Sequence, residues 1–339
     1  MPLSNDSKIL ITGGTGSFGK AFLSKVLKQY PNISRIVIFS RDELKQWELK
    51  QKFPQKDYPQ LRFFLGDIRD KERLNSALEK IDIVIHAAAL KQVNAAEYNP
   101  IEFIKTNILG SENLVQACIQ NNVKKIVALS TDKAAAPINL YGATKLCADK
   151  LFVAANNIKG DRDMSFSCVR YGNVMGSRGS VIPLFLRESK KGVIPLTDNK
   201  MTRFNITLDE SISMVFWVLE HALGGEIFIP KIPSYKITEL AEAIGPSCKR
   251  EIIGIREGEK LHEEMITSSD SINTFDIGDY YAMIPGDYQP KAHFEKMGFN
   301  FKPVNEGFSY CSNKNEKFLS KEEIRELIKK NVDRKFNPI

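Results

Sequence analysis

The chain has 339 residues, of which 42% are hydrophobic and 26% charged, so it can bury a large core like an ordinary globular protein. Its net charge of +7 comes from basic residues scattered among acids, which favours anionic small molecules over nucleic acid as ligands. It has no membrane-spanning apolar run, no signal-peptide pattern and no Cys-x-x-Cys, which predicts a cytoplasmic protein with reduced thiols, no membrane association and no metal site.

Short apolar runs alternate with helix-length segments in the first 172 residues. Buried strands are predicted at residues 8–12, 35–39, 61–65, 81–86, 125–129 and 165–170. Helices are predicted at residues 20–30, 100–121 and 141–156. Strands separated by helices indicate a parallel sheet covered on both faces. The fold class is therefore α/β, with a Rossmann-like doubly wound parallel sheet in residues 1–172.

The pattern changes after this domain. Residues 173–310 are predicted to form a smaller, mixed α/β substrate-binding lobe, and a segment at about 201–232 is expected to return to the first domain. Residues 311–339 form a C-terminal helix and tail. The helix, at 320–332, begins with a capping-box pattern, and we interpret it as a docking or interface element.

A glycine-rich loop follows the first strand and opens the first helix. Its glycines have the spacing G-x-x-G-x-x-G. A turn without side chains lets a pyrophosphate approach backbone N–H groups at a helix N-terminus, although glycines also gather in ordinary turns. The position between strand and helix favours dinucleotide binding. The residues assigned to the dinucleotide here are Gly13, Thr15, Gly16, Ser17, Phe18 and Gly19.

The end of the second strand predicts which dinucleotide binds. An enzyme that prefers NAD usually has an acid at this position, whereas a basic residue suits the 2′-phosphate of NADP. Arg41, with Ser40 as a hydrogen-bond donor, therefore favours NADP, while the adjacent Asp42 is an argument against it. The alternative for Arg41 is a plain surface charge. Further along, Asp67 and Ile68 are expected at the adenine, and Ala87, Ala88 and Ala89 leave room for the cofactor.

Tyr141 and Lys145 lie four residues apart at the start of a predicted helix, so their side chains share one face. We expect the lysine ammonium to lower the pKa of the phenol, so that Tyr141 can exchange a proton with a substrate hydroxyl. After a glycine loop, this pair is the arrangement of the short-chain dehydrogenase/reductase family, which the whole chain resembles.

An acid and an amine, Asp132 and Lys133, follow Thr131 at the end of the fifth predicted strand. Ligands bind at this edge of a parallel sheet, although a surface ion pair is the alternative. The pair offers acid and base chemistry beyond that of a simple reductase. Once a sugar is oxidised at C4, a base can remove the C5 proton while an acid helps the C6 hydroxyl leave. We assign Lys133 as the base, with a pKa lowered by burial, Lys145 and the nicotinamide, and Asp132 as the acid.

Longer blocks resemble the UDP-N-acetylglucosamine 4,6-dehydratases that invert C5, within the extended short-chain dehydrogenases/reductases. These blocks are ITGGTGSFGK (11–20), FSRDELKQ (39–46), HAAALKQV (86–93), ALSTDKAAAPINLYGATK (128–145), VRYGNVMGSRGSVIP (169–183), MTRFNITLDE (201–210) and IGIREGEKLHEEM (253–265). Retaining relatives carry Asp-Glu where this chain has Asp132-Lys133. The resemblance therefore implies C5 inversion.

The same resemblance implies further contacts and a biological setting. It implies that Lys45 and Lys91 contact the cofactor, along with Tyr141 and Lys145. It implies that the UDP-sugar is bound by Lys91, Asn173, Val181, Thr197, Arg203, Arg256 and Glu259, with the two arginines at the diphosphate. It also implies a homo-oligomer, a dimer or hexamer, that makes a deoxy-amino sugar such as pseudaminic acid for flagellin glycosylation.

Two other functions fit the same motifs. A UDP-sugar 4-epimerase shares the fold, the cofactor site and the Tyr141–Lys145 pair. A non-catalytic NADP-sensing protein would share the fold, but it would not need those residues together with Asp132 and Lys133.

Overall fold

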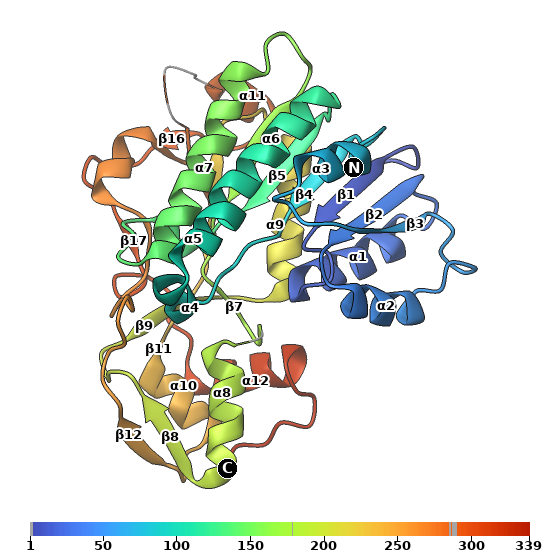
Figure 1. Ribbon diagram of the computed structural model, residues 1–339. Helices are drawn as coiled ribbons and strands as arrows, with labels where there is room; N and C mark the ends of the chain where they lie inside the picture. Colours follow the sequence, from blue (N-terminus) through green and yellow to red (C-terminus); the bar gives the residue numbers. More distant parts are fainter. Residues whose placement is uncertain (1–2, 178, 285, 287–289) are drawn as a thin grey trace.

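We analysed a computed structural model that describes residues 3–177, 179–284, 286 and 290–339. Its centre is a ten-stranded sheet (Figure 1). In order across the sheet, the strands are β16 (Lys302–Pro303), β14 (Thr274–Asp276), β15 (Tyr280–Met283), β10 (Ile227–Pro230), β6 (Ser165–Val169), β5 (Lys125–Leu129), β4 (Ile83–His86), β1 (Lys8–Thr12), β2 (Arg35–Ser40) and β3 (Leu61–Leu65). The strands from β10 to β3 pair in parallel, and β15, β14 and β16 extend the sheet antiparallel.

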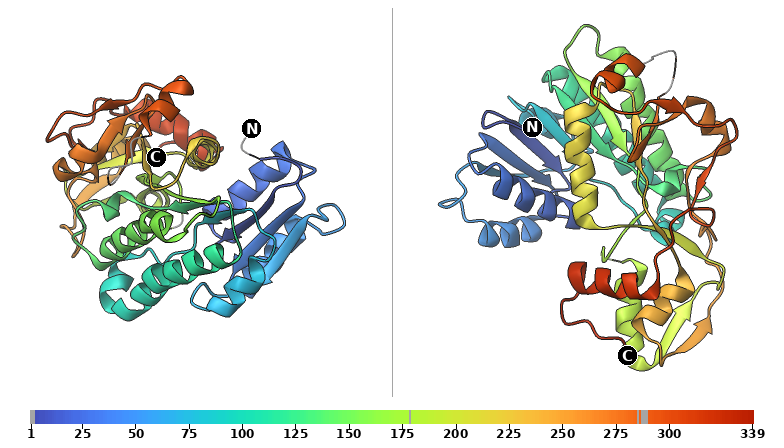
Figure 2. Two further views of the ribbon diagram at one scale, coloured as in Figure 1. Left: turned by 90° about the horizontal axis from the view of Figure 1, so that it is seen from above. Right: turned by 180° about the vertical axis from the view of Figure 1, so that it is seen from behind.

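Helices cover both faces of this sheet (Figures 1 and 2). One face carries α3 (Lys71–Ala77), α6 (Gly110–Gln120) and α7 (Leu140–Ile158), and the other carries α1 (Ser17–Gln29), α2 (Glu43–Lys52) and α9 (Leu208–His221). Strands enclosed on both faces lose contact with water on both faces, and β1 and β4 are accordingly almost entirely buried, with apolar residues at their centres. The predicted α/β, doubly wound fold class is confirmed.

The predicted helix at 100–121 is not a uniform α-helix. It consists of α5 (Pro100–Phe103), a π-helical segment η1 (Ile104–Leu109) and α6. Inside the π segment, the side-chain amide of Asn107 pairs with both the N–H and the C=O of Leu90 and donates to the hydroxyl of Thr144. The wider turn thus ties this helix to the loop after β4 and to α7, and such π segments often occur at functional sites.

Three short helices were not predicted from apolar spacing. They are α2, α3 and α4 (Val93–Tyr98). The side chains of Asp42 and Asp70 accept hydrogen bonds from the backbone at the starts of α2 and α3, so N-terminal capping marks these two helices better than periodicity does.

Several segments from the second half of the chain build a smaller lobe with its own buried apolar cluster. Its elements include β7 (Asn173–Val174), α8 (Val181–Glu188), η3 (Ser189–Lys191), β8 (Val193–Leu196), β9 (Thr202–Ile206), β11 (Ser234–Lys236), α10 (Ile237–Ile244), β12 (Lys249–Ile252) and α12 (Lys321–Asn331). The elements of the whole chain that have not yet been named are η2 (Asp132–Ala134), β13 (Glu264–Ile266), η4 (Ser268–Asn273), α11 (Lys291–Lys296) and β17 (Tyr310–Cys311). The capping box of α12 is formed, and its residues Ile324 and Ile328 are buried in the cluster beside α10.

In the second half of the chain, neighbouring segments alternate between the large domain and the smaller lobe. Within residues 201–232, α9 and β10 belong to the large domain, and β9 belongs to a separate three-stranded sheet with β7 and β11. Residues 274–303, which the expected division assigns to the substrate lobe, supply β14, β15 and β16 to the large sheet. These strands belong to the large sheet because β15 pairs with β10. No local sequence pattern predicts this pairing. Among the described helices, none is long and apolar enough to cross a membrane.

Candidate active site

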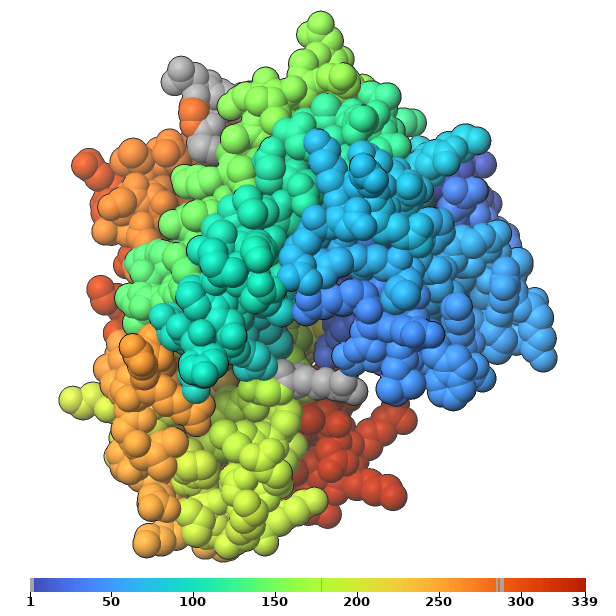
Figure 3. All heavy atoms as spheres, in the orientation of Figure 1, coloured from blue at the N-terminus to red at the C-terminus, as the bar shows by residue number. Residues whose placement is uncertain are grey.

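A cavity of about 950 Å³ lies between the sheet's carboxyl edge and the smaller lobe. Figure 3 shows the surface hollowed where the N-terminal half meets the lobe. Its lining includes nearly all of the residues assigned from the sequence. Two assigned residues do not line it, because Asp132 and Lys145 are almost fully buried behind its wall.

The glycine loop forms one wall of the cavity. Gly13 has a φ of 64°, and a Cβ there would lie 2.8 Å from the backbone N of Ala88. A Cβ at Gly19 would lie 2.5 Å from the Cα of Gly14, so only glycine lets α1 approach the loop this closely. Gly16 caps α1 without a side-chain hydrogen bond, which leaves the helix start open toward the cavity. This shape fits a pyrophosphate at the helix N-terminus.

The end of β2 carries the residues assigned to cofactor choice. The carboxylate of Asp42 accepts the backbone N–H of Lys45 and pairs with the Lys45 ammonium, which lowers the pKa of Asp42. Asp42 is therefore engaged in capping α2. Arg41 is half exposed at the cavity, 3.7 Å from Asp67, and the hydroxyl of Ser40 accepts a hydrogen bond from the amide of Gln46.

The strands β3 and β4 end at the same wall. Burial alone would raise the pKa of Asp67, but hydrogen bonds from Arg69 outweigh it and lower the pKa. The backbone N–H groups of Ala87 and Ala88 donate to the hydroxyl of Thr12 at 3.2 Å. These bonds fix the loop after β4 beside the glycine loop. Asp67, Ile68 and all three alanines at 87–89 line the cavity.

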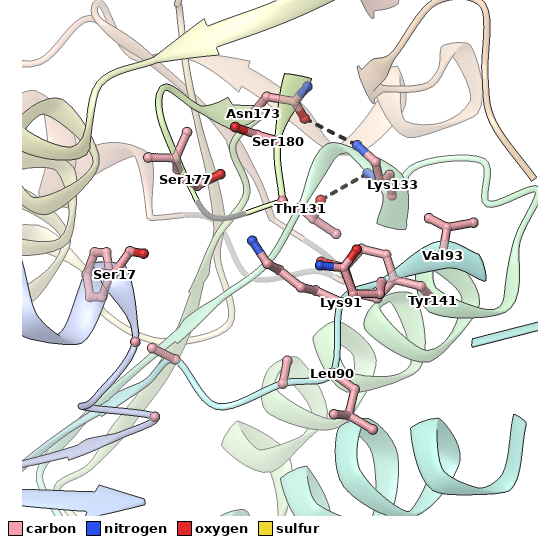
Figure 4. A pocket seen from close by; sticks show the side chains of 18 of the residues that line it. Ser17, Leu90, Lys91, Val93, Thr131, Lys133, Tyr141, Asn173, Ser177 and Ser180 are labelled. Atoms are coloured by element: carbon pink, nitrogen blue, oxygen red, sulfur yellow. Dashed lines mark hydrogen bonds between the residues drawn. The ribbon is translucent and has the colours of Figure 1, made fainter. Parts of the chain in front are cut away.

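The acid–amine pair follows β5 directly, on the 3₁₀ turn η2. Thr131 precedes this turn, accepts the backbone N–H of Lys133 and donates its hydroxyl to Oδ1 of Asp132 at 2.9 Å. The ammonium of Lys133 lies 3.0 Å from the same Oδ1. Its distance to Oδ1 of Asn173 is 3.4 Å, a contact that Figure 4 shows. It also lies 3.2 Å from Oε1 of Glu263. Lys133 is thus held between two carboxylates.

These contacts correct one expectation. Burial by itself would lower the pKa of Lys133, but the charges of Asp132 and Glu263 outweigh burial and raise it. The raised pKa favours the ammonium form of Lys133, and the expected lowering of its pKa is wrong. Burial raises the pKa of Asp132 and Glu263 adds to this effect, although the Lys133 ammonium and the hydroxyl of Thr131 act in the opposite direction. Its Oδ2 is buried and has no partner among the described residues.

Tyr141 and Lys145 lie on the first turns of α7, whose N-terminus is capped by the side chain of Asn139. Burial raises the pKa of Tyr141 to about 12, although Lys133 and the hydroxyl of Thr131 act in the opposite direction. The expected lowering by Lys145 is therefore also wrong. The reason is geometric, because the ammonium of Lys145 donates to the carbonyl of Leu129 at 2.7 Å behind the cavity wall.

The smaller lobe supplies the other side of the cavity. Its lining contains the seven residues assigned to the UDP-sugar, namely Lys91, Asn173, Val181, Thr197, Arg203, Arg256 and Glu259, of which Lys91 comes from the loop after β4. Arg203 is buried and donates to the carbonyls of Thr202, Leu261 and Lys260. Arg256 is exposed at the cavity instead. Of the two arginines, Arg256 is therefore the more accessible to a diphosphate.

Sequence reasoning missed Glu263 and a buried network behind α7. In that network, Asp149 accepts from the hydroxyl of Ser130 at 2.7 Å and pairs with Arg170 at 3.1 Å. No short-range spacing connects residues 133 and 263, or 149 and 170. The only available signal was the position of Glu263 inside the block IGIREGEKLHEEM. Within the described residues, no cluster of three His, Cys, Asp or Glu side chains could hold a metal ion.

The chain is similar to known proteins over nearly its whole length. Residues 9–285 match the family described as polysaccharide biosynthesis protein. The chain is 52% identical to the inverting UDP-N-acetylglucosamine 4,6-dehydratase of Campylobacter jejuni, over 96% of this chain and 98% of the relative. It is 42% identical to a UDP-glucose 4-epimerase of Rickettsia conorii, over 95% of each chain. The X-ray structure of Pen from Bacillus thuringiensis superposes with a TM-score of 0.86 at 40% identity, covering 95% of this chain and 97% of that one.

Proposed function

The chain belongs to the polysaccharide biosynthesis protein family, within the extended short-chain dehydrogenases/reductases, and on that premise we propose that it dehydrates UDP-N-acetylglucosamine with inversion at C5. The product is a UDP-4-keto-6-deoxy-L-arabino-hexosamine. The main observation behind this proposal is the cluster of Thr131, Asp132, Lys133 and Tyr141 at the carboxyl edge of the sheet. The 52% identity to a relative of that name supports the same reaction.

The glycine loop and the strand ends fit a nicotinamide dinucleotide. Gly13, Gly16 and Gly19 would hold the pyrophosphate, Ser40 and Arg41 the adenosine ribose, and Asp67 and Ile68 the adenine. When bound, such a cofactor would supply the acceptor for a hydride from C4 of the sugar and the donor of that hydride to C6, so it would end unchanged. Catalysis therefore needs no added reductant.

We propose that the cofactor is NADP. Arg41 is half exposed, and its guanidinium can pair with a 2′-phosphate. Asp42 would oppose that phosphate if its carboxylate were available, but capping of α2 and the pair with Lys45 occupy it. Calorimetry with Arg41→Ala tests this proposal. We expect NADP affinity to fall about tenfold or more while NAD affinity changes little. An equal loss for both dinucleotides would contradict NADP preference.

The residues of the cluster have distinct roles in the proposed reaction. Tyr141, assisted by Thr131, takes the proton of the C4 hydroxyl. Asp132, whose pKa is raised by burial, starts protonated and gives its proton to the departing C6 hydroxyl. Lys133 removes the C5 proton once it has lost its own extra proton. A proton from solvent returns to C5 from the other face and completes the inversion, and Tyr141 releases the C4 hydroxyl proton to solvent.

We assign the sugar nucleotide to the side of the cavity lined by the smaller lobe. Arg256 and Lys91 bring positive charge to that side, which suits a diphosphate. Asn173 lies beside Lys133 and would orient the sugar near the base. Val181 and Thr197 lie on the same side of the cavity.

The product formed from UDP-N-acetylglucosamine in deuterated water tests the function. We expect NMR to show a 4-keto-6-deoxy sugar with one deuterium at C5 and the L-arabino configuration. No added NADPH is consumed. Retention at C5, or a product that keeps its C6 hydroxyl, would refute the proposal. Lys133→Ala is the matched control, and it should form no deuterated product.

A UDP-sugar 4-epimerase is the second candidate. The observation in its favour is the 42% identity, over 95% of each chain, to a relative named UDP-glucose 4-epimerase. An epimerase inverts C4 and keeps the C6 hydroxyl, so the same NMR experiment separates the two activities. A non-catalytic NADP-sensing protein would give no product at all.

We further propose a cytoplasmic homo-oligomer, a dimer or hexamer, that supplies pseudaminic acid or a related deoxy-amino sugar for flagellin glycosylation. Light scattering coupled to size-exclusion chromatography tests the assembly. A monomer at all concentrations would contradict it.

A further inference from the structure

Glu263 contacts the proposed base from the smaller-lobe side of the cavity, just before β13. Its side chain is only 2% exposed. Its backbone is fixed on both sides by Ser312, because its N–H donates to that hydroxyl at 2.9 Å and its C=O accepts the Ser312 N–H at 2.8 Å. Oε1 lies 3.2 Å from the Lys133 ammonium and 3.7 Å from Nε of Arg203. Oε2 is buried and has no hydrogen-bond partner within the described residues.

The charges around this pair favour an ion pair at rest. Burial alone would raise the pKa of Glu263, but Lys133, Arg203 and Lys260 outweigh it and lower the pKa. The groups that face Lys133 or Glu263 from the packed elements are Asp132, Lys91, Tyr141, Tyr235, Arg203 and Lys260. A base that removes a C–H proton must be a neutral amine, so Lys133 must first lose one proton.

Two carboxylates contact Lys133 among the described residues. Asp132 cannot take the proton, because in the proposed reaction it starts protonated as the acid for the C6 hydroxyl. Its Oδ1 also accepts hydrogen bonds from both Thr131 and Lys133. Glu263 is ionised, within hydrogen-bond distance, and held rigidly by Ser312.

We propose that Glu263 is the proton store of the base, accepting the extra proton of Lys133 before C5 is deprotonated. An N–H bond of the ammonium breaks and an O–H bond forms on Oε1, with no change in net charge and no electron transfer to another group. Lys133 thus becomes a neutral amine without releasing its proton to solvent. Once C5 is deprotonated, Lys133 is an ammonium again. It passes that proton to Asp132, which has given its own proton to the departing hydroxyl, and then recovers the stored proton from Glu263. Glu263 acts through Lys133, so it is a positioning residue, and this inference rests on the proposed dehydration.

The test is the pH dependence of deuterium uptake at C5, from about pH 6 to about pH 9, in the full-length enzyme with UDP-N-acetylglucosamine. The wild-type product is characterised first, so that failure of the proposed function is recognised separately. For Glu263→Gln we expect exchange at about pH 7 to fall at least about tenfold. Its rate should then rise with pH along a one-proton titration that the wild type lacks, because Lys133 must now release its proton to solvent.

Two variants complete the test. Glu264→Gln removes the neighbouring carboxylate, which does not line the cavity, and should behave like the wild type. Glu263→Asp keeps a carboxylate farther from the amine, so exchange should fall without gaining the titration. If Glu263→Gln does not fold, the test rests on Glu263→Asp. Deuterium exchange at the wild-type rate in Glu263→Asp would then overturn the proposal. A Glu263→Gln profile that superimposes on the wild-type profile would also overturn it.

Discussion

The buried pair between Asp149 and Arg170 allows a prediction that separates stability from chemistry. Both side chains are 2% exposed, and their atoms lie 3.1 Å apart. Asp149 also accepts the hydroxyl of Ser130, and Arg170 donates to the carbonyl of Met265. The pair therefore joins α7, which carries Tyr141, to β6, the end of β5 and β13.

Replacing Asp149 by Asn keeps the size of the side chain but leaves the Arg170 charge buried without a counter-ion. Removing one partner of a buried ion pair costs about 3–5 kcal/mol. The amide oxygen of the new side chain still accepts the hydrogen bond from the Ser130 hydroxyl, so this bond adds nothing to the expected loss of stability. The double variant Asp149→Leu/Arg170→Met removes both charges, and apolar replacements of such pairs are often neutral or stabilising. It should recover most of the lost stability.

The assay is urea unfolding followed by tryptophan fluorescence, since Trp217 packs against Phe228 and Tyr280 in the core of the large domain. The exposed pair of Lys231 and Asp276 is the control, because Asp276→Asn should cost at most about 1 kcal/mol. The reasoning is wrong if Asp149→Asn loses less than about 1 kcal/mol. It is also wrong if the double variant is no more stable than Asp149→Asn.

Three further predictions concern the site and its support. Burial lowers the pKa of His86 to about 3, below its ordinary value of about 6.5, so the unfolded chain binds this proton first as the pH falls. The stability that neutral His86 contributes is complete above about pH 6.5 and declines by up to ~1.4 kcal/mol per pH unit toward about pH 3. His86→Asn should remove this dependence of the free energy of unfolding on pH, measured by urea titrations at several pH values. If the dependence is unchanged in the variant, it comes from other titrating groups. Gly19→Ala forces a methyl against Gly14, so calorimetry should show dinucleotide affinity reduced about tenfold or more, with a stability loss of about 1–3 kcal/mol; wild-type affinity would mean that the loop adjusts freely. Lys133→Ala should lower turnover about a hundredfold or more, and ordinary turnover would remove the base from the mechanism. The variant also leaves the buried carboxylate of Glu263 without its cation, so we expect the Tm to fall, and turnover is compared at a temperature where both proteins are folded.

Much of the large domain could be predicted because its signals are local. Strands of a parallel sheet that is covered on both faces are rich in apolar residues, so β1, β2, β3, β5 and β6 each stand out as short, mostly apolar runs between polar segments. The glycine loop and the Tyr141–Lys145 spacing are equally local. The π segment η1 could not be predicted, because it depends on Asn107 reaching Leu90 across the fold.

The sequence alone determined the α/β class, the position of the dinucleotide loop and the identity of the acid–amine pair, because each follows from residues close together in the chain. Only the tertiary structure decided the charge of Lys133. Glu263 lies 3.2 Å from it in space although it is distant in sequence, and Asp132 and Glu263 together outweigh the effect of burial on the pKa of Lys133. Protonation states depend on distances in space, and chain order does not contain them.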